Sequence, residues 1–233
     1  MCKKIFNFFQ KGKRLFKLEK NKIKIFITGF FNSGKTTLIH TLDDKAISVE
    51  KKLAHAYNNE KTHTTTGFDL ARLVWVRPNL EFKTEGVIMN KTEYLRDKNE
   101  YSGWHTLNIE LKGCPGQMQF SAVRKILAKG NDGVILLIDG SDLVNIGNGL
   151  VILEETRAVL GQNIPLRIIA NKADRDDYCG CEMITNMMGE QVYSTSAKRN
   201  IGIKDAIIHV SKIILNETNE NSIVNKEGIV QNG

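Results

Sequence analysis

A glycine loop directly after a short apolar run limits the possible folds of this chain more than any other feature. Residues 29–36 read Gly-Phe-Phe-Asn-Ser-Gly-Lys-Thr and follow the strand-like run Ile23–Thr28. They fit Gly-x4-Gly-Lys-[Ser/Thr] at every fixed position, and a helix is expected to begin at Lys35. Strand, glycine loop and helix N-terminus in this order predict an α/β fold with a phosphate-binding loop.

The residue types inside this loop suit phosphate and metal chemistry. Lys35 is placed to reach the β- and γ-phosphates, and the Thr36 hydroxyl to bind Mg²⁺. A chance match in a chain of this length has a probability on the order of one in a hundred, given that glycine makes up about 7% of average proteins. The candidate phosphate-binding set is completed by four neighbours: Asn32, Ser33, Gly34 and Thr37.

Beyond the loop, apolar runs alternate with segments of helical spacing. We expect strands at Phe68–Val76, Thr106–Leu111, Val134–Ile138, Leu166–Ala170 and Val192–Thr195. Helical spacing marks Leu150–Leu160 and Ile203–Leu215. This alternation predicts a mostly parallel sheet with helices on both faces.

Three stretches depart from this rhythm. Asp43–His63 has little periodicity and is interpreted as a functional loop. The polar segment Arg77–Gly103 is interpreted as a surface insertion, either a hairpin extension or a partly ordered loop. Residues 216–233 are rich in Asn and Glu without periodicity, which is typical of a disordered tail.

A second motif follows the buried run that ends at Ala170. In Asn171-Lys172-Ala173-Asp174, the carboxylate can accept hydrogen bonds from both N1–H and the exocyclic amine of guanine, whereas adenine has neither donor on that edge. A site built around such a bond rejects analogues lacking it by roughly 10⁴–10⁵. Ser196-Ala197-Lys198 follows the next strand, and the Ala197 N–H is expected to bind the guanine carbonyl oxygen.

With these three motifs in this order, residues 22–215 resemble the Ras-like small GTPase superfamily, and Asp132–Asp139 looks most like its Arf-like and prokaryotic branches. Residues 116–120, Gly-Gln-Met-Gln-Phe, are similar to the switch II motif Gly-Gln-Glu-Arg-Phe. The resemblance implies a Ras-like P-loop GTPase fold, a six-stranded mostly parallel sheet with one antiparallel edge pair and five helices. It also implies binding of GTP and GDP with Mg²⁺ and slow GTP hydrolysis. The protein would then be a molecular switch with an effector, an exchange factor and an activating protein.

The resemblance also assigns the switch residues. Thr65 corresponds to the switch I threonine, which completes the Mg²⁺ shell, although Thr64 and Thr66 beside it leave the register open. Gly116 would offer its N–H to the γ-phosphate, and Gln117 would orient the attacking water. A solvated loop amide is the alternative interpretation of Gln117.

One position departs from the family pattern. Where the family has the aspartate of Asp-x-x-Gly, which holds Mg²⁺ through a water, this chain has Gly113. Asp69 is a conceivable substitute and Asp139 a weaker one. Loss of such an outer metal partner typically costs 10–100-fold in affinity. Gly113 therefore keeps an alternative open, a non-hydrolysing GTP-bound scaffold that recruits a partner through the insertion at 77–103.

The net charge of +7 is located almost wholly at the N-terminus. Residues 1–24 carry nine basic side chains and one acid, so the remaining chain has a net charge of −1. We therefore expect no nucleic-acid binding by the domain itself. The arm, residues 1–21, has the basic amphipathic composition of a helix that lies on a membrane surface. Docking onto the domain, a partner groove and non-specific nucleic-acid attraction are the alternatives. Four cysteines and no secretory leader favour the cytoplasm, with peripheral contact to the cytoplasmic membrane face.

Overall fold

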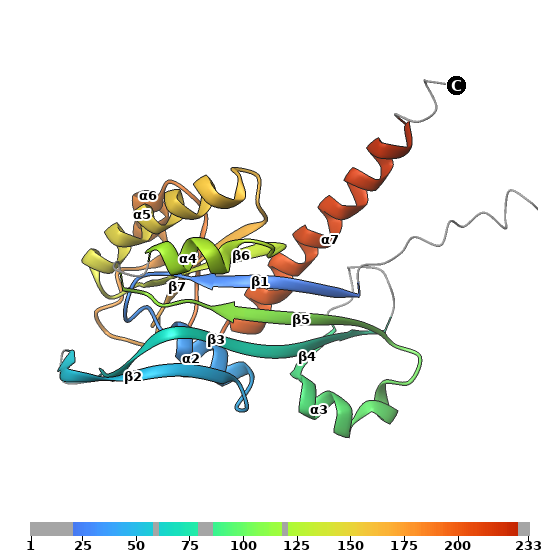
Figure 1. Ribbon diagram of the computed structural model, residues 1–233, viewed down its shortest axis with the longest axis horizontal. Coiled ribbons are helices and arrows are strands. Elements are labelled where there is room, and N and C mark those ends of the chain that lie inside the picture. The colour runs from blue at the N-terminus through green and yellow to red at the C-terminus, as the bar shows by residue number, and fades with distance from the viewer. Residues whose placement is uncertain (1–20, 58–60, 79–85, 118–120, 228–233) are drawn as a thin grey trace, which may run out of the picture.

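A computed structural model describes residues 21–57, 61–78, 86–117 and 121–227, and their side chains except those of 49–57, 61–67 and 216–227. A twisted sheet runs through the molecule with helices on both faces (Figure 1). The strand order is β2-β3-β5-β1-β6-β7-β8, with β4 also paired to β3. The pairs on either side of β1 and onward to β8 are parallel, and every antiparallel pair involves β3.

The element bounds follow the chain in order. The strands are β1 Lys22–Thr28, β2 Ile47–Tyr57, β3 Lys61–Arg77, β4 Val87–Asn90, β5 His105–Gly113, β6 Gly133–Asp139, β7 Leu166–Asn171 and β8 Val192–Ser194. The helices are α2 Lys35–Leu42, α3 Lys91–Arg96, a 3₁₀ turn Lys98–Tyr101, α4 Ser121–Ala128, α5 Leu143–Leu160, α6 Cys181–Met188 and α7 Ile203–Glu227.

The core lies on both faces of the sheet because the central strands are buried on both sides. β6 is buried at all seven positions. On one face, Ile25, Ile135 and Ile169 pack against the apolar residues of α2 and α7. On the other face, Leu136 and Ile168 pack against α5 and α6, and Phe26 lies near α4. The predicted α/β fold with helices on both faces is therefore confirmed.

The expectation of six strands is wrong, because the sheet has eight. Strand β2 lies in the stretch 43–63, which was expected to be a loop, and pairs with β3 from Ile47 to Tyr57. As an edge strand with Lys51 and Lys52 in its sequence, it lacks the apolar pattern of a buried strand. Strand β4 is the second addition and pairs with β3 through residues 87–90.

The segment 77–103 contains β4, α3 and the 3₁₀ turn, so in the described part of the chain it is folded onto β3. Helix α3 begins with a capping box in which Asn90 accepts from the Glu93 N–H and Glu93 accepts from the Asn90 N–H. With α3, the described residues hold six α-helices where five were expected. Val74, Val76 and Met89 form a small apolar cluster, and Tyr94 of α3 packs against it.

Helix α7 does not end at Leu215 but continues to Glu227, which corrects the expectation of a disordered tail over residues 216–227. Neither glycine nor proline occurs between Ile203 and Glu227, so no residue there forces the helix to end. Its C-terminal half projects beyond the sheet (Figure 1). Residues 228–233 and residues 1–20 of the basic arm lie outside the described residues. None of the described helices has the length and apolarity needed to cross a bilayer.

Candidate nucleotide-binding site

The sequence motifs meet at the carboxyl ends of the parallel strands. Loop 29–36 follows β1, residues 171–174 follow β7, and residues 196–198 follow β8. After β1 the chain passes first to β3 and β5 on one side and then to β6 on the other. Ligands of open α/β sheets bind at such a switch point, just beyond the strand ends.

Two glycines of loop 29–36 are required by close backbone approach. A Cβ at Gly29 would lie 2.0 Å from the Leu137 carbonyl oxygen, and Gly29 has φ +147°. A Cβ at Gly34, with φ +97°, would lie 2.3 Å from the Asn171 side-chain nitrogen. Asn32 has φ +66°, a strained conformation for a residue with a side chain. The tight curl around Ser33, which is fully buried, is the geometry that a phosphate cradle needs.

The Lys35 ammonium lies at the centre of this curl. Its Nζ donates to the Phe30 carbonyl oxygen at 2.8 Å and to Ser33 Oγ at 3.2 Å. Gly116, on the other side, is so near that a Cβ there would lie 2.6 Å from Lys35 Nζ. The structure thus brings the switch II glycine against the lysine predicted to bind the γ-phosphate.

Asn171 joins loop 29–36 to the segment 196–198, which is predicted to bind the base. Its Nδ2 donates to the Ser33 carbonyl oxygen at 2.9 Å, and its Oδ1 accepts from the Ala197 N–H at 2.8 Å. Asn171 is only 2% exposed, so these bonds are shielded from water. The Ala197 N–H, expected to be available to guanine, is therefore already engaged by Asn171, and a base oxygen would have to share it.

Asp174 is held as an ionised acceptor. Ser196 Oγ donates to its Oδ1 at 2.5 Å, and Arg199 Nε lies 3.9 Å from its Oδ2. The hydrogen bond from Ser196 is the main reason that the pKa of Asp174 lies below its ordinary value, with smaller contributions from the charges of Arg199 and Lys198. An oriented carboxylate of this kind suits two adjacent N–H donors.

Lys172 is also fixed in direction. Its Nζ donates to Asp139 Oδ2 at 2.5 Å, and its backbone has φ +66°. Asp139 ends β6 beside Asn171 and accepts from Ser141 as well. The pair with Asp139 fixes the ammonium end of the Lys172 side chain.

At the other end of the site, Thr36 meets an aspartate of β3. Thr36 Oγ1 donates to Asp69 Oδ2 at 2.9 Å, and Asp69 is fully buried. Its second oxygen, Oδ1, is buried without a hydrogen-bond partner among the described residues. Asp69 lies opposite Gly113 in the β3–β5 pairing.

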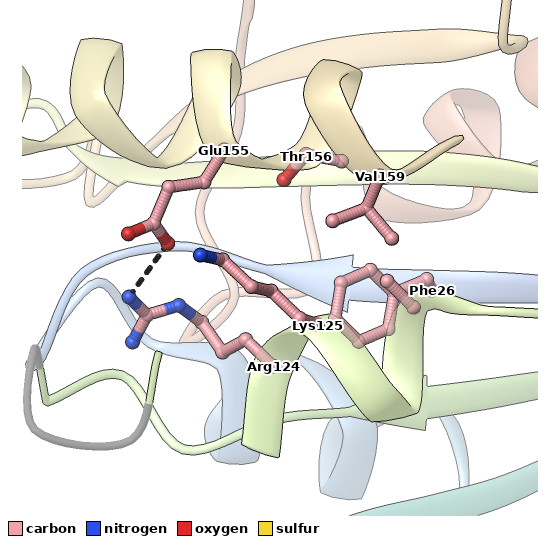
Figure 2. Close-up of a pocket in the computed structure, with 7 residues that line it drawn as sticks. Phe26, Arg124, Lys125, Glu155, Thr156 and Val159 are labelled. Atoms are coloured by element: carbon pink, nitrogen blue, oxygen red, sulfur yellow. Dashed lines mark hydrogen bonds and ion pairs between the residues drawn. The ribbon is translucent and has the colours of Figure 1, made fainter. Parts of the chain in front are cut away.

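Gln117 is anchored through its backbone. Arg124 of α4 donates from Nη1 to the Gln117 carbonyl oxygen at 2.8 Å and from Nη2 to Glu155 Oε2 at 2.9 Å. Ser121 Oγ donates to Glu155 Oε1 at 2.9 Å. Figure 2 shows Arg124 and Glu155 reaching each other across a small pocket between α4 and α5, with Phe26 at its other end. The arrangement ties Gln117, predicted to lie in switch II, to Glu155 of α5.

Four predicted site residues are not joined to this network by a described side-chain contact: Asn32, Thr37, Thr65 and Lys198. Thr37 and Lys198 are exposed. Thr65 lies in β3, paired with Glu50 of β2, and its side chain is outside the described residues. Among the described side chains of β3, Asp69 reaches Thr36.

Sequence reasoning missed two supporting residues. Asn145 of α5 is 1% exposed; its Nδ2 donates to the Phe31 carbonyl oxygen at 2.7 Å, and its Oδ1 accepts from the Asp139 N–H at 3.0 Å. Arg124 is the other. The only local signal for Asn145 was an amide within an apolar helical stretch, since the contacts themselves span 114 positions for Asn145–Phe31.

Comparison with known proteins finds similarity to GTP-binding proteins. The family model of the elongation factor Tu GTP-binding domain matches residues 20–225. Ras-related protein Rab-21 of Dictyostelium discoideum is 30% identical over 44% of this chain and 51% of that protein. Human Rab-21 is 26% identical over 57% and 60%. ADP-ribosylation factor-like protein 6 of Caenorhabditis elegans is 23% identical over 80% and 79%.

The chain spans about half to three fifths of the length of the Rab-21 relatives. The family model, in contrast, covers most of the 233 residues, including the phosphate loop and both base-reading motifs. The chain therefore belongs to the family of the elongation factor Tu GTP-binding domain, within the Ras-like superfamily of small GTPases.

Proposed function

We propose that this small GTPase binds GTP and GDP with Mg²⁺, hydrolyses GTP slowly and acts as a molecular switch. The observation that carries the proposal is the pair of hydrogen bonds of the Asn171 side chain, which link Ser33 of the phosphate loop to Ala197 of the proposed base site. One buried side chain thereby sets the spacing between the phosphate-binding and guanine-binding motifs. This spacing suits a guanine nucleotide, whose phosphates would bind at one motif and whose base would bind at the other.

The proposed chemistry uses residues on both sides of Lys35. Asp174 would accept from guanine, and Lys35 and the Gly116 N–H would bind the γ-phosphate. Thr36 would hold Mg²⁺, which supplies charge neutralisation at the β- and γ-phosphates when bound. Gln117, held through its carbonyl oxygen by Arg124, would orient the attacking water. Support for the metal comes from Asp69 Oδ1, a buried oxygen beside Thr36 that has no hydrogen-bond partner among the described residues.

The switching step would act on the β2–β3 hairpin. Thr65 pairs with Glu50 within this hairpin, while a switch I threonine has to reach Mg²⁺ and the γ-phosphate. We therefore expect β2 and β3 to separate near Thr65 when GTP binds and to pair again after hydrolysis, an order–disorder change of the kind that other switches use. Effector and regulatory proteins, including an exchange factor and an activating protein, would read this difference.

Two measurements test the proposal. Nucleotide that co-purifies with the full chain, released by denaturation and separated by chromatography, should be GDP or GTP. ATP that competes equally with GTP would contradict the guanine assignment. In a multiple-turnover phosphate-release assay, we expect a rate on the order of 10⁻⁴–10⁻² per second without a partner. Gln117→Leu should lose most of this turnover and keep GTP binding. A chain that binds GTP without turnover would instead support the scaffold alternative.

We also propose peripheral contact with the cytoplasmic face of a membrane through residues 1–21. Support comes from the sequence alone, in which the chain after residue 24 has a net charge of −1. Liposomes with anionic lipids should sediment the full chain and not a chain that begins at Asn21. Added salt should weaken this binding without abolishing it, because screening does not affect the apolar part. Equal sedimentation of the two chains would refute the contact.

A further inference from the structure

We infer that Asp69 of β3 supplies the carboxylate that holds Mg²⁺ in this chain, and that Gly113 is the matching change that makes room for it. The inference rests on the proposed binding of a guanine nucleotide with Mg²⁺. It concerns the position where the chain departs from the Asp-x-x-Gly pattern of its superfamily. The structure places a carboxylate on the neighbouring strand β3, at Asp69, which pairs with Gly113.

Asp69 lies next to the predicted magnesium ligand of the phosphate loop. Thr36, the residue of the phosphate loop predicted to bind Mg²⁺, donates to Asp69 Oδ2 at 2.9 Å. The two residues are 33 positions apart, and strand β3 brings them together. Asp69 therefore lies directly beside a magnesium ligand, where an added carboxylate strengthens the binding of a hard cation.

The Asp69 carboxylate is buried. Asp69 is 0% exposed, and its Oδ1 has no hydrogen-bond partner among the described residues. In that part of the chain Asp69 forms no ion pair, and its hydrogen bond is the one from Thr36. A buried carboxylate without a cation costs several kcal/mol in effective desolvation. A bound Mg²⁺ or its water would satisfy the open oxygen and compensate the charge.

The absence of a side chain at Gly113 leaves space for Asp69. A Cβ at Gly113 would lie 3.0 Å from Asp69 Cβ, 3.1 Å from Asp69 Oδ2 and 2.6 Å from Ile39 Cδ1. Asp69 and Gly113 are direct cross-strand partners. The usual aspartate at 113 would thus compete with Asp69 for the same space and place two like charges opposite each other, which is destabilising. One carboxylate fits, and here β3 provides it.

Asp139, the other candidate substitute, is used elsewhere. Its Oδ2 accepts from Lys172, and its Oδ1 accepts from the N–H and the hydroxyl of Ser141. Both of its oxygens therefore have partners in the base-binding half of the site. Asp69 is the carboxylate that keeps an oxygen open beside Thr36.

The test measures nucleotide release rather than turnover. The full chain is loaded with a fluorescent GDP analogue, and release into excess GDP is followed over a range of buffered free Mg²⁺. In the unmodified chain Mg²⁺ should slow release with a defined midpoint. Asp69→Asn, which keeps size and can still accept from Thr36, should raise this midpoint about 10–100-fold. The swap Asp69→Ala with Gly113→Asp should return it toward the original value.

A matched control separates charge at the metal from general damage. Asp43 is also buried, and its two oxygens accept from the Lys45 and Arg72 N–H groups, so Asp43→Asn removes a structural carboxylate. We expect Asp43→Asn to lower thermal stability and leave the Mg²⁺ midpoint unchanged. A midpoint for Asp69→Asn equal to that of the unmodified chain would overturn the inference while the proposed function stands. A swap variant that binds nucleotide with the midpoint of Asp69→Asn would refute the shared-space argument. An unmodified chain that retains no labelled GDP at any Mg²⁺ concentration would refute the proposed function, and the inference with it.

Discussion

The two ends of the candidate site are built differently. At the base end, Asn171, Asp174 and Lys172 are each fixed by hydrogen bonds to side chains or backbone of neighbouring loops. At the γ-phosphate end, Thr65 belongs to a strand pair, and Gln117 is held through its backbone carbonyl oxygen by Arg124.

This difference in construction suggests that the base end is built to recognise guanine and the γ-phosphate end to switch between two arrangements. A prearranged base end loses little conformational freedom when guanine binds, so its hydrogen bonds contribute fully to affinity and specificity. In the proposed switch, the γ-phosphate end would have to distinguish GTP from GDP and would therefore need two arrangements whose energies are close. Four substitutions test this difference between the two ends.

The largest effect is expected at the base end. Asp174→Asn replaces the bidentate acceptor by an amide, and we expect preference for guanine over adenine nucleotides to fall by roughly 10⁴-fold. Competition binding with GDP and ADP measures this ratio. Asp177→Asn is the control, because Asp177 lies in the same loop, is exposed and pairs with Arg175. Preserved discrimination in Asp174→Asn would mean that another residue reads the base.

The second change tests the anchoring of switch II. Arg124→Lys keeps a positive charge but cannot bond to both Gln117 and Glu155 through a planar fork. We expect single-turnover hydrolysis to fall by up to about 10²-fold, because the water-orienting residue loses its alignment. GDP affinity should stay unchanged. Lys125→Ala on the same helix is the control, and a parallel loss of affinity and rate in Arg124→Lys would argue against a positioning role.

The third change tests whether the fixed end extends to α5. Asn145→Ala removes the hydrogen bond to the Phe31 carbonyl oxygen and the one from the Asp139 N–H. We expect the free energy of unfolding to fall by about 1–3 kcal/mol. Denaturant unfolding measures it, with Asn148→Ala as the control, since the hydrogen bond of Asn148 among the described residues is a local one to the Val144 carbonyl oxygen. Equal losses in the two variants would show that the tie to the phosphate loop adds no stability.

The smallest effect concerns pH. Burial raises the pKa of Glu155, but hydrogen bonds from Arg124 and Ser121 outweigh it and hold the pKa below its ordinary value of 4.5. A carboxylate with a lower pKa in the folded chain stabilises it above the unfolded pKa, and this stability is lost as pH falls through the folded value. The partly exposed pair contributes up to about 1 kcal/mol.

We therefore expect Glu155→Gln to flatten the loss of stability just below pH 4.5. Urea unfolding at a series of acidic pH values measures the slope. Glu154→Gln, exposed on the same helix, should keep the slope of the unmodified chain. An unaltered slope in Glu155→Gln would assign the acid sensitivity to other carboxylates.

Much of the fold could be predicted because its signals are local. The apolar run Val134–Ile138 lies inside β6, and the helix expected at Lys35 begins there. The edge strand β2 was missed because a strand with one neighbour and a charged sequence needs little apolar periodicity. The end of α7 was also missed, since a polar sequence without periodicity fits a solvated helix as well as a disordered tail.

The family and the contiguous motifs could be recognised from the sequence, because a phosphate loop or a predicted base-reading tetrapeptide acts through residues close together along the chain. The distant side chains that support these motifs could be identified from the folded chain alone. Thr36 and Asp69 are 33 positions apart, Arg124 and Glu155 are 31 apart, and Asn145 and Phe31 are 114 apart. Such pairs leave no local pattern, because hydrogen bonding depends on distance in space, and strand order alone brings Asp69 to the space left open by Gly113.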